Sequence, residues 1–211
     1  MLSPTLEAPR LRLTADLARV CAATQVAPMR LSEILSSADD RGFALVLLLT
    51  TFPFVLPFPT LGLATPVGFA LALAAVGLVL GRPAALPAAL GALEVGPRAA
   101  ARAAAVVSRA NGVLARLTRP RMAFMMADGM RIVLGLSLFT AAFVLGLPIP
   151  LPLSNFFPAV AILLLAAGML EGDGLLVACG HVATVAVCAV VALSGTTVLA
   201  IGSRVLAAVC K

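Results

Sequence analysis

The chain has 211 residues, of which 62% are hydrophobic and 11% are charged, and its net charge is +6 at neutral pH. A soluble domain contains roughly 25% charged residues. A soluble fold of this length cannot hide so much apolar surface, so lipid must be part of its solvent. We therefore exclude a soluble enzyme and expect a compact, all-α integral membrane protein.

The first segment, residues 1–42, is predicted to stay in the cytoplasm. Charges recur along it, which argues against a signal peptide. Leu13, Leu17 and Val20 lie on one side of a predicted short amphipathic helix. The first uncharged block, from Phe43 to Gly81, is then the part that inserts into the membrane.

Three long stretches carry no charge, namely residues 43–81, 132–170 and 174–203. One spanning helix needs about 20 residues. The first two stretches are therefore long enough for helical hairpins. The C-terminal segment, residues 174–211, has room for one long span or two short ones.

The two hairpin segments resemble each other. When the chain is shifted by 91 residues without a gap, 11 of the 37 positions from Leu45 to Gly81 meet an identical residue. This predicts an internal duplication with units at residues 43–81 and 132–173. The prolines that match break each unit into two apolar arms: Pro57 and Pro59 with Pro148 and Pro150.

Each arm is too short to cross a membrane alone, which leaves two geometries. The pairs are either re-entrant hairpins whose non-helical tips are shielded by protein, or plain hairpins that the prolines extend to the far surface. Duplicated broken helices are typical of transporters. The glycines that match are predicted to let helices pack closely, within the chain or in a homodimer: Gly77 and Gly81 with Gly168 and Gly172.

The connector between the units, residues 82–131, has eight arginines and a net charge of +6. An amphipathic helix is predicted over residues 98–117, with a basic face toward anionic lipid headgroups. That face carries Arg98, Arg102, Arg109 and Arg116. A cytoplasmic connector makes the two repeats parallel; inverted repeats require residues 98–117 to cross the bilayer, at a high cost in buried charge. The connector has one aromatic residue, Phe124, and the chain has no Tyr or Trp. A platform for base stacking is therefore lacking, and nucleic acid is not an expected partner.

Polar residues in and near the breaks are candidate substrate-binding or gating residues. Ser154 and Asn155 of the second break either line a polar pocket with Thr60 and Thr65 of the first, or satisfy backbone groups that the prolines leave free.

Glu171 and Asp173 form a Glu-Gly-Asp-Gly corner, which is either a turn that pairs with arginine or an ion-responsive gate. His181, the one histidine, is a functional or a helix-packing residue. We expect no catalytic constellation, no metal site and no cofactor, because neither a CxxC pair nor a phosphate-binding loop is present.

Several motifs resemble the ExoD family. These are LSEIL at Leu31–Leu35, RGF at Arg41–Phe43, LPIP at Leu147–Pro150, NFFPA at Asn155–Ala159 and EGDGLL at Glu171–Leu176. The resemblance covers roughly residues 31–193. Phe54 and the segment PLPLSN depart from the family pattern. The resemblance implies a multi-pass protein of the bacterial inner membrane that is connected with exopolysaccharide synthesis, and it implies no established reaction.

These observations predict a protein that transports, or gates access for, a lipid-linked or anionic solute. The alternative is a scaffold or regulator that organises other exopolysaccharide synthesis proteins without transport. A polar cavity between the two breaks favours transport, whereas a dry, packed interface favours a scaffold.

Overall fold

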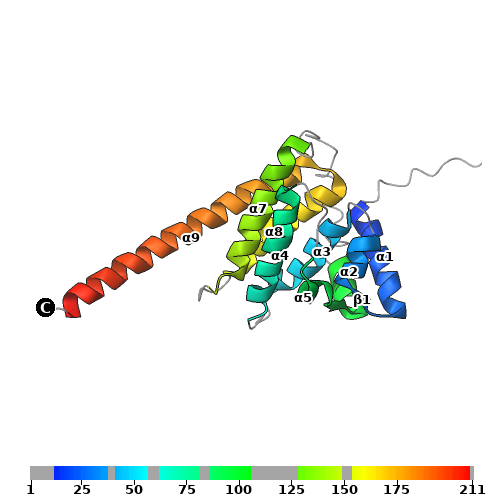
Figure 1. Cartoon of the computed structure of the whole chain (residues 1–211), viewed down its shortest axis with the longest axis horizontal. Coiled ribbons are helices and arrows are strands. Elements are labelled where there is room, and N and C mark those ends of the chain that lie inside the picture. Colours follow the sequence, from blue (N-terminus) through cyan, green and yellow to red (C-terminus); the bar gives the residue numbers. More distant parts are fainter. Residues whose placement is uncertain are drawn as a thin grey trace, which may run out of the picture.

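The computed structural model describes residues 12–37, 41–56, 62–80, 86–105, 128–148 and 154–209. As expected, these residues are mostly helical (Figure 1). Residues 97–105 are helical, and the labelled elements follow in the order α1 (Arg12–Val26), β1 (Met29–Arg30), α2 (Leu31–Ser37), α3 (Gly42–Thr51), η2 (Phe52–Val55), α4 (Ala64–Val79), α5 (Ala88–Gly91), β2 (Glu94–Val95), α7 (Asp128–Gly146), α8 (Phe156–Glu171) and α9 (Gly174–Val209).

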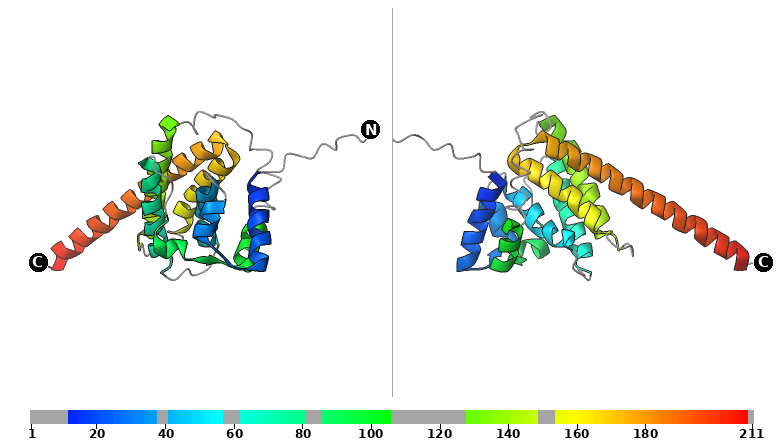
Figure 2. Two further views of the ribbon diagram at one scale, coloured as in Figure 1. Left: turned by 45° about the vertical axis from the view of Figure 1, so that its right-hand side comes forward. Right: turned by 180° about the vertical axis from the view of Figure 1, so that it is seen from behind.

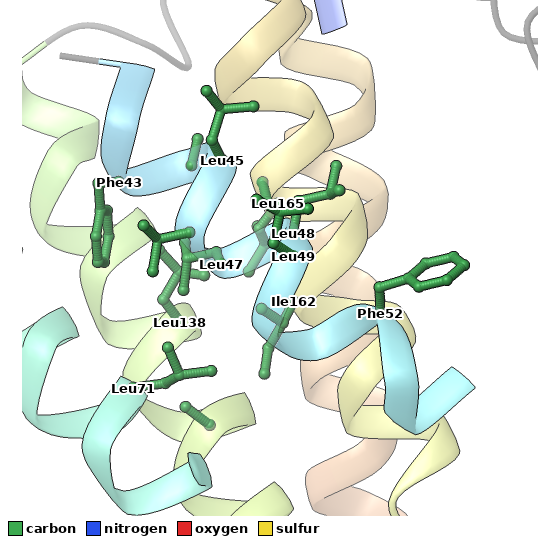
Figure 3. Close-up of a cluster of buried hydrophobic side chains, with 14 of the residues drawn as sticks. Phe43, Leu45, Leu47, Leu48, Leu49, Phe52, Leu71, Leu138, Ile162 and Leu165 are labelled. Carbon is green, nitrogen blue, oxygen red and sulfur yellow. The ribbon is translucent and has the colours of Figure 1, made fainter. Parts of the chain in front are cut away.

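Helix α3 is the centre of the molecule. Every residue from Gly42 to Leu49 is buried. Its side chains lie near Leu138 of α7, Leu71 of α4 and Ile162 of α8 (Figure 3). Because Pro53 cannot continue the α-helix, α3 passes into the 3-10 helix η2. The first uncharged stretch therefore begins with a helix covered by protein, where we had expected lipid contact.

Helices α4 and α7 pack antiparallel through glycines. A Cβ atom on Gly68 would overlap the backbone of Gly146, and one on Gly135 would lie 3.1 Å from the Val79 nitrogen. The rings of Phe69 and Phe143 meet edge to face across this contact, with centroids 5.6 Å apart. The absence of side chains at these glycines allows the two backbones to approach.

Helices α8 and α9 pack in a similar way. A Cβ atom on Gly168 would lie 2.8 Å from the Val177 nitrogen, and one on Gly180 would lie 3.1 Å from the Leu165 nitrogen. Gly172 differs from our expectation of a packing role. Its φ of +67° ends α8, and a Cβ there would meet nothing within 4 Å. Gly77 is half-buried in α4, and Gly81 lies outside the described residues.

The helix ends that flank the two proline-rich breaks lie at the same end of the bundle, where α4 and α8 begin and α7 ends. Helices α3 and α7 run in one direction, and α4 and α8 run in the other (Figures 1 and 2). Arg41, at the start of α3, contacts Leu170 near the end of α8, and η2 contacts α8 as well. Pro148 is exposed at the end of α7. Pro57, Pro59 and Pro150 lie outside the described residues.

The N-terminal segment and the connector form a layer beside α3, which the sequence did not suggest. Strands β1 and β2 pair antiparallel, with Met29 opposite Val95 and Arg30 opposite Glu94. Leu17 of α1 and Ile34 of α2 are buried in the common core. The sheet therefore joins two segments that lie on either side of the first hairpin in the sequence.

Two of the described helices are long and apolar enough to cross a membrane, namely Gly129–Gly146 within α7 and Gly174–Leu193 within α9. Helix α9 is one continuous helix of 36 residues, so the alternative of two short C-terminal spans is wrong. Helices α4 and α8 have 16 residues each, which is about 24 Å at 1.5 Å per residue.

The α4–α7 contact gives a direct test of the packing. We expect Gly68→Ala to lower the free energy of unfolding by roughly 1–3 kcal/mol, because the new methyl group pushes the two backbones apart. Gly129→Ala is the matched control: it meets open space at the start of α7 and, as a better helix former, adds up to about 1 kcal/mol. Thermal unfolding in detergent measures both, and equal changes would contradict the packing.

Candidate functional site

The break end of the bundle holds the predicted polar residues that the structure describes. Ser154 and Asn155 precede α8, Thr65 lies in the first turn of α4, and all three are half-buried. Thr60 lies outside the described residues. The N-terminal residues of α4 and α8 therefore bring polar groups from both units to one end of the molecule.

The starts of α4 and α8 are built alike. A proline is the third residue of each helix, Pro66 in α4 and Pro158 in α8. The next N–H donates to the carbonyl four residues back, from Val67 to Leu63 and from Ala159 to Asn155, at 3.2 Å in both cases. Neither helix has a side-chain N-cap hydrogen bond. Backbone N–H groups at such starts attract negative charge.

The protein beside this end is apolar. Phe52 and Phe54 are buried in η2, which packs against α8. Phe54, the departure from the family pattern, thus fills the interior. The hydroxyl of Thr51 is buried and makes no hydrogen bond among the described residues. Among the described residues, the part of the protein between the first break and α8 is therefore formed largely by apolar side chains.

The Glu-Gly-Asp-Gly corner turns the chain from α8 into α9. Asp173 is 1% exposed. Its Oδ1 accepts a hydrogen bond of 2.9 Å from the Leu175 N–H, and thereby caps the start of α9. Its own N–H donates to the Gly168 carbonyl at 3.0 Å. Glu171 is half-buried beside it. Asp173 is therefore a buried residue that caps α9. This differs from our expectation of a turn that pairs with arginine.

Sequence reasoning missed an ionic junction beside this corner, at the C-terminal end of α8 and away from the breaks. Arg41 Nη2 lies 2.8 Å from Oδ2 of the buried Asp16 and donates to the Leu170 carbonyl at 2.8 Å. Arg19, which is 82% exposed, lies 3.6 Å from Asp16 Oδ1. Arg41 thus holds α1 against the C-terminal end of α8, where a positive charge is favourable. The available signal was an acidic residue directly before Leu17, on the apolar side of α1.

His181 has a specific partner inside the bundle. Its Nδ1 lies 2.7 Å from the Ser137 Oγ, which joins α9 to α7. The Nε2 atom is buried and has no hydrogen-bond partner among the described residues. Thr184, one turn further on, donates to the carbonyl of Gly180 in its own helix. The geometry gives His181 a helix-joining contact.

The structure describes two of the four arginines predicted on the basic face of the connector. Arg98 and Arg102 are exposed, while Ala100 and Ala103 of the same helix are buried, so this part of the connector is amphipathic. Arg109 and Arg116 lie outside the described residues.

Burial raises the pKa of the Cys21 thiol, which keeps it protonated. Among the described residues, no group of three metal-ligating side chains occurs.

Comparison with known proteins decides the family. The profile of a family described as "Exopolysaccharide synthesis, ExoD" matches residues 13–193. The chain belongs to the ExoD family. Protein ExoD of Rhizobium meliloti (strain 1021) is 33% identical over 178 residues, which cover 82% of this chain and 72% of that protein. No solved structure matches the chain.

A second relative is an uncharacterized protein of Synechocystis sp. (strain ATCC 27184 / PCC 6803 / Kazusa). It is 28% identical over 162 residues, or 74% of each chain. The family match begins at residue 13, so the resemblance extends further toward the N-terminus than the start near residue 31 that we expected, and residues 1–12 lie outside it. Helix α1, with its Asp16 contact to Arg41, is part of the ExoD unit.

The ionic junction predicts unequal effects of two arginine substitutions. We expect Arg41→Met to lower the free energy of unfolding by roughly 2 kcal/mol, because Asp16 then stays buried without its nearest cation. Arg19→Met is the matched control, and its exposed side chain should change stability by less than about 0.5 kcal/mol. Hydrogen exchange of the α1 amides and thermal unfolding measure both, and equal effects would show that Arg41 does not hold α1.

The His181–Ser137 contact predicts an energetic coupling between α7 and α9. In a double-mutant cycle, Ser137→Ala and His181→Leu should be coupled by about 1 kcal/mol, as expected for a hydrogen bond between helices. The control cycle pairs Ser137→Ala with Thr184→Val, because the Thr184 hydroxyl bonds within its own helix. A control coupling as large as the first would argue against a specific contact.

Proposed function

We propose that this chain is a multi-pass protein of the bacterial inner membrane with a cytoplasmic N-terminus. It moves, or gates access for, a lipid-linked or anionic solute in exopolysaccharide synthesis. The observation that carries the proposal is the placement of the starts of α4 and α8 at one end, beside half-buried Thr65, Ser154 and Asn155. Two broken helices that direct uncapped N–H groups to one place suit an anionic group.

An internal duplication with parallel repeats is part of the proposal. Helices α4 and α8 have equal lengths and start with the same hydrogen bond after a proline. The first helix of each unit packs against the second helix of the other, as α3 does on α8 and α7 on α4. Exchange of the two units maps one contact onto the other, which supports a twofold axis along the membrane normal.

We also propose that the breaks are re-entrant tips inside the membrane. Helices α4 and α8, at about 24 Å, are shorter than the hydrocarbon core of about 30 Å. A non-helical tip is tolerated there only where protein or water covers its backbone. Buried Phe52 and Phe54 of η2, packed on α8, supply such cover for the first break.

The second candidate function is a membrane scaffold that organises exopolysaccharide synthesis proteins without moving a solute. The observation in its favour is the apolar packing of η2 on α8, because the described wall beside the breaks offers few hydrogen-bonding groups. The described bundle also lacks a free carboxylate at its centre, which proton-coupled carriers usually need. The two candidates differ in whether solute crosses the membrane.

The test is flux through the purified chain in liposomes, with a fluorescent polyprenyl phosphate and inorganic phosphate as separate probes. We expect movement of one probe, and we expect Asn155→Leu to slow it about tenfold, because a polar group at the start of α8 is lost. Thr140→Val is the matched control, since its hydroxyl donates to Leu136 in its own helix.

Exopolysaccharide secretion by cells that lack the native chain provides the second readout. Under the transport proposal, Asn155→Leu lowers secretion and Thr140→Val restores it fully. If neither probe moves and both variants restore secretion equally, transport is wrong and the scaffold is favoured.

A further inference from the structure

The contact between His181 and Ser137 lies in an uncharged part of the protein. Residues 132–170 and 174–203 contain no Asp, Glu, Lys or Arg, and His181 is the one histidine of the chain. Its Nδ1 lies 2.7 Å from the Ser137 Oγ. On the other side of the ring, Nε2 is buried and has no hydrogen-bond partner among the described residues. The described protein therefore engages the ring at one nitrogen.

This geometry fits one form of the ring. A neutral imidazole carries a single proton, on either nitrogen. With the proton on Nδ1, the ring donates to the Ser137 Oγ and has no N–H group without an acceptor. The other tautomer would bury an Nε2–H group that has no acceptor, which is costly. The neutral ring with its proton on Nδ1 is thus the form that the closed contact accommodates.

A second proton does not fit this place. The imidazolium form has an N–H group at both nitrogens and a positive charge. The new Nε2–H group would have no acceptor among the described residues, and a buried charge is costly unless it is paired and hydrogen-bonded. The closed contact and the charged ring therefore exclude each other.

The helices that pack on α9 offer no compensating charge at this level. At the neighbouring Gly180, the side chain of Leu165 of α8 approaches α9. The ionisable groups of α7, of α8, of the corner and of residues 174–193 of α9 are Asp128, Arg131, Glu171, Asp173, Cys179 and Cys188.

None of these groups can neutralise a charged His181 in place. Arg131 has the same sign, and the thiols are uncharged in acid. Asp173 stands eight residues before His181, about 12 Å along the helix, and its Oδ1 caps α9. Asp128 and Glu171 lie at the same end of the bundle as Asp173, at the start of α7 and the end of α8.

We propose that the His181–Ser137 contact is a proton-operated joint between α7 and α9. The joint is closed while His181 is neutral, and protonation of Nε2 opens it by separating α9 from α7 at this level, so that water reaches the ring. Close contacts at Gly168 and Gly180 hold α9 on α8, so the movement is relative to α7. The proposal requires neither solute movement nor re-entrant breaks.

The test measures the distance between α7 and α9 as the pH is lowered. The full chain, with its four native cysteines replaced by alanine, is placed in lipid nanodiscs and carries spin labels at Leu136→Cys and Val185→Cys. Both positions are exposed, at 51% and 69%. We expect one distance at about pH 7.5 and a second, longer distance that grows with a midpoint between about pH 4.5 and 6.5, because a free imidazole takes up its proton below about pH 6.5.

A reference pair separates opening of the joint from general unfolding. Labels at Leu73→Cys of α4 and Leu136→Cys of α7 report on a contact between residues 64–79 and 132–146, which contain no ionisable side chain. We expect this distance to stay constant over the same pH range. An equal change in both pairs would overturn the proposal, because the whole bundle would then respond to acid.

Variants of the two partners identify the group that titrates. His181→Asn keeps a polar atom near the position of Nδ1 but does not titrate, so its α7–α9 distance should stay constant; His181→Gln serves as a second variant of this kind. Ser137→Ala weakens the closed joint and should raise the midpoint by roughly half a pH unit to one unit, toward about 6.5. Thr184→Val should leave it unchanged, since that hydroxyl bonds within its own helix.

Three further outcomes would overturn the proposal. They are a constant α7–α9 distance in the wild-type chain down to about pH 4.5, the same change in His181→Asn or His181→Gln as in the wild type, and a midpoint above the value of about 6.5 for a free imidazole. Joint opening without solute flux supports this inference and counts against the transport proposal alone.

Discussion

Complete enclosure of α3 is the constraint on which the rest of the structure depends. A helix that is hydrophobic on all sides is covered either by protein or by lipid, and in α3, which has ten residues, protein buries all of them except Thr50. Helix α8 covers one side of it, and α2 of the N-terminal layer packs against it as well. This need explains why the N-terminal segment belongs to the family unit. It also explains why the Arg41–Asp16 contact stands at the start of α3, where α1 must be held in place.

Local chemistry made part of the fold predictable. Proline removes a hydrogen-bond donor wherever it occurs, so a break within each of the first two uncharged stretches followed from the sequence alone. The structure adds that α3 already gives way to a 3-10 helix at Pro53 and that α8 begins two residues before Pro158. The roles of matching glycines did not. Gly168 and Gly172 share a motif, but one lies within a helix contact and the other at a helix end. Their roles differ because α8 ends at Glu171, so that Gly168 lies inside the helix and Gly172 follows its last residue.

Long-range contacts could not be predicted from the pattern. Ser137 and His181 are 44 residues apart, and Arg41 meets a carbonyl 129 residues away. Periodicity assigns a face to each helix but does not say which faces meet. Two of the predicted site residues make structural contacts: Asp173 caps α9, and His181 joins α9 to α7. Under the proposed function, the solute contacts the polar residues at the starts of α4 and α8, and the apolar side chains of η2 lie beside that site.

The packing of α9 has a mechanical consequence. Its first half is held against α8 at Gly168 and Gly180 and against α7 by the His181–Ser137 contact, so this helix of 36 residues cannot turn freely at Gly172. Residues 194–209 continue it for about 24 Å at 1.5 Å per residue. Any change in the position of α7 relative to α8 is therefore carried along one stiff rod to the C-terminal end of α9.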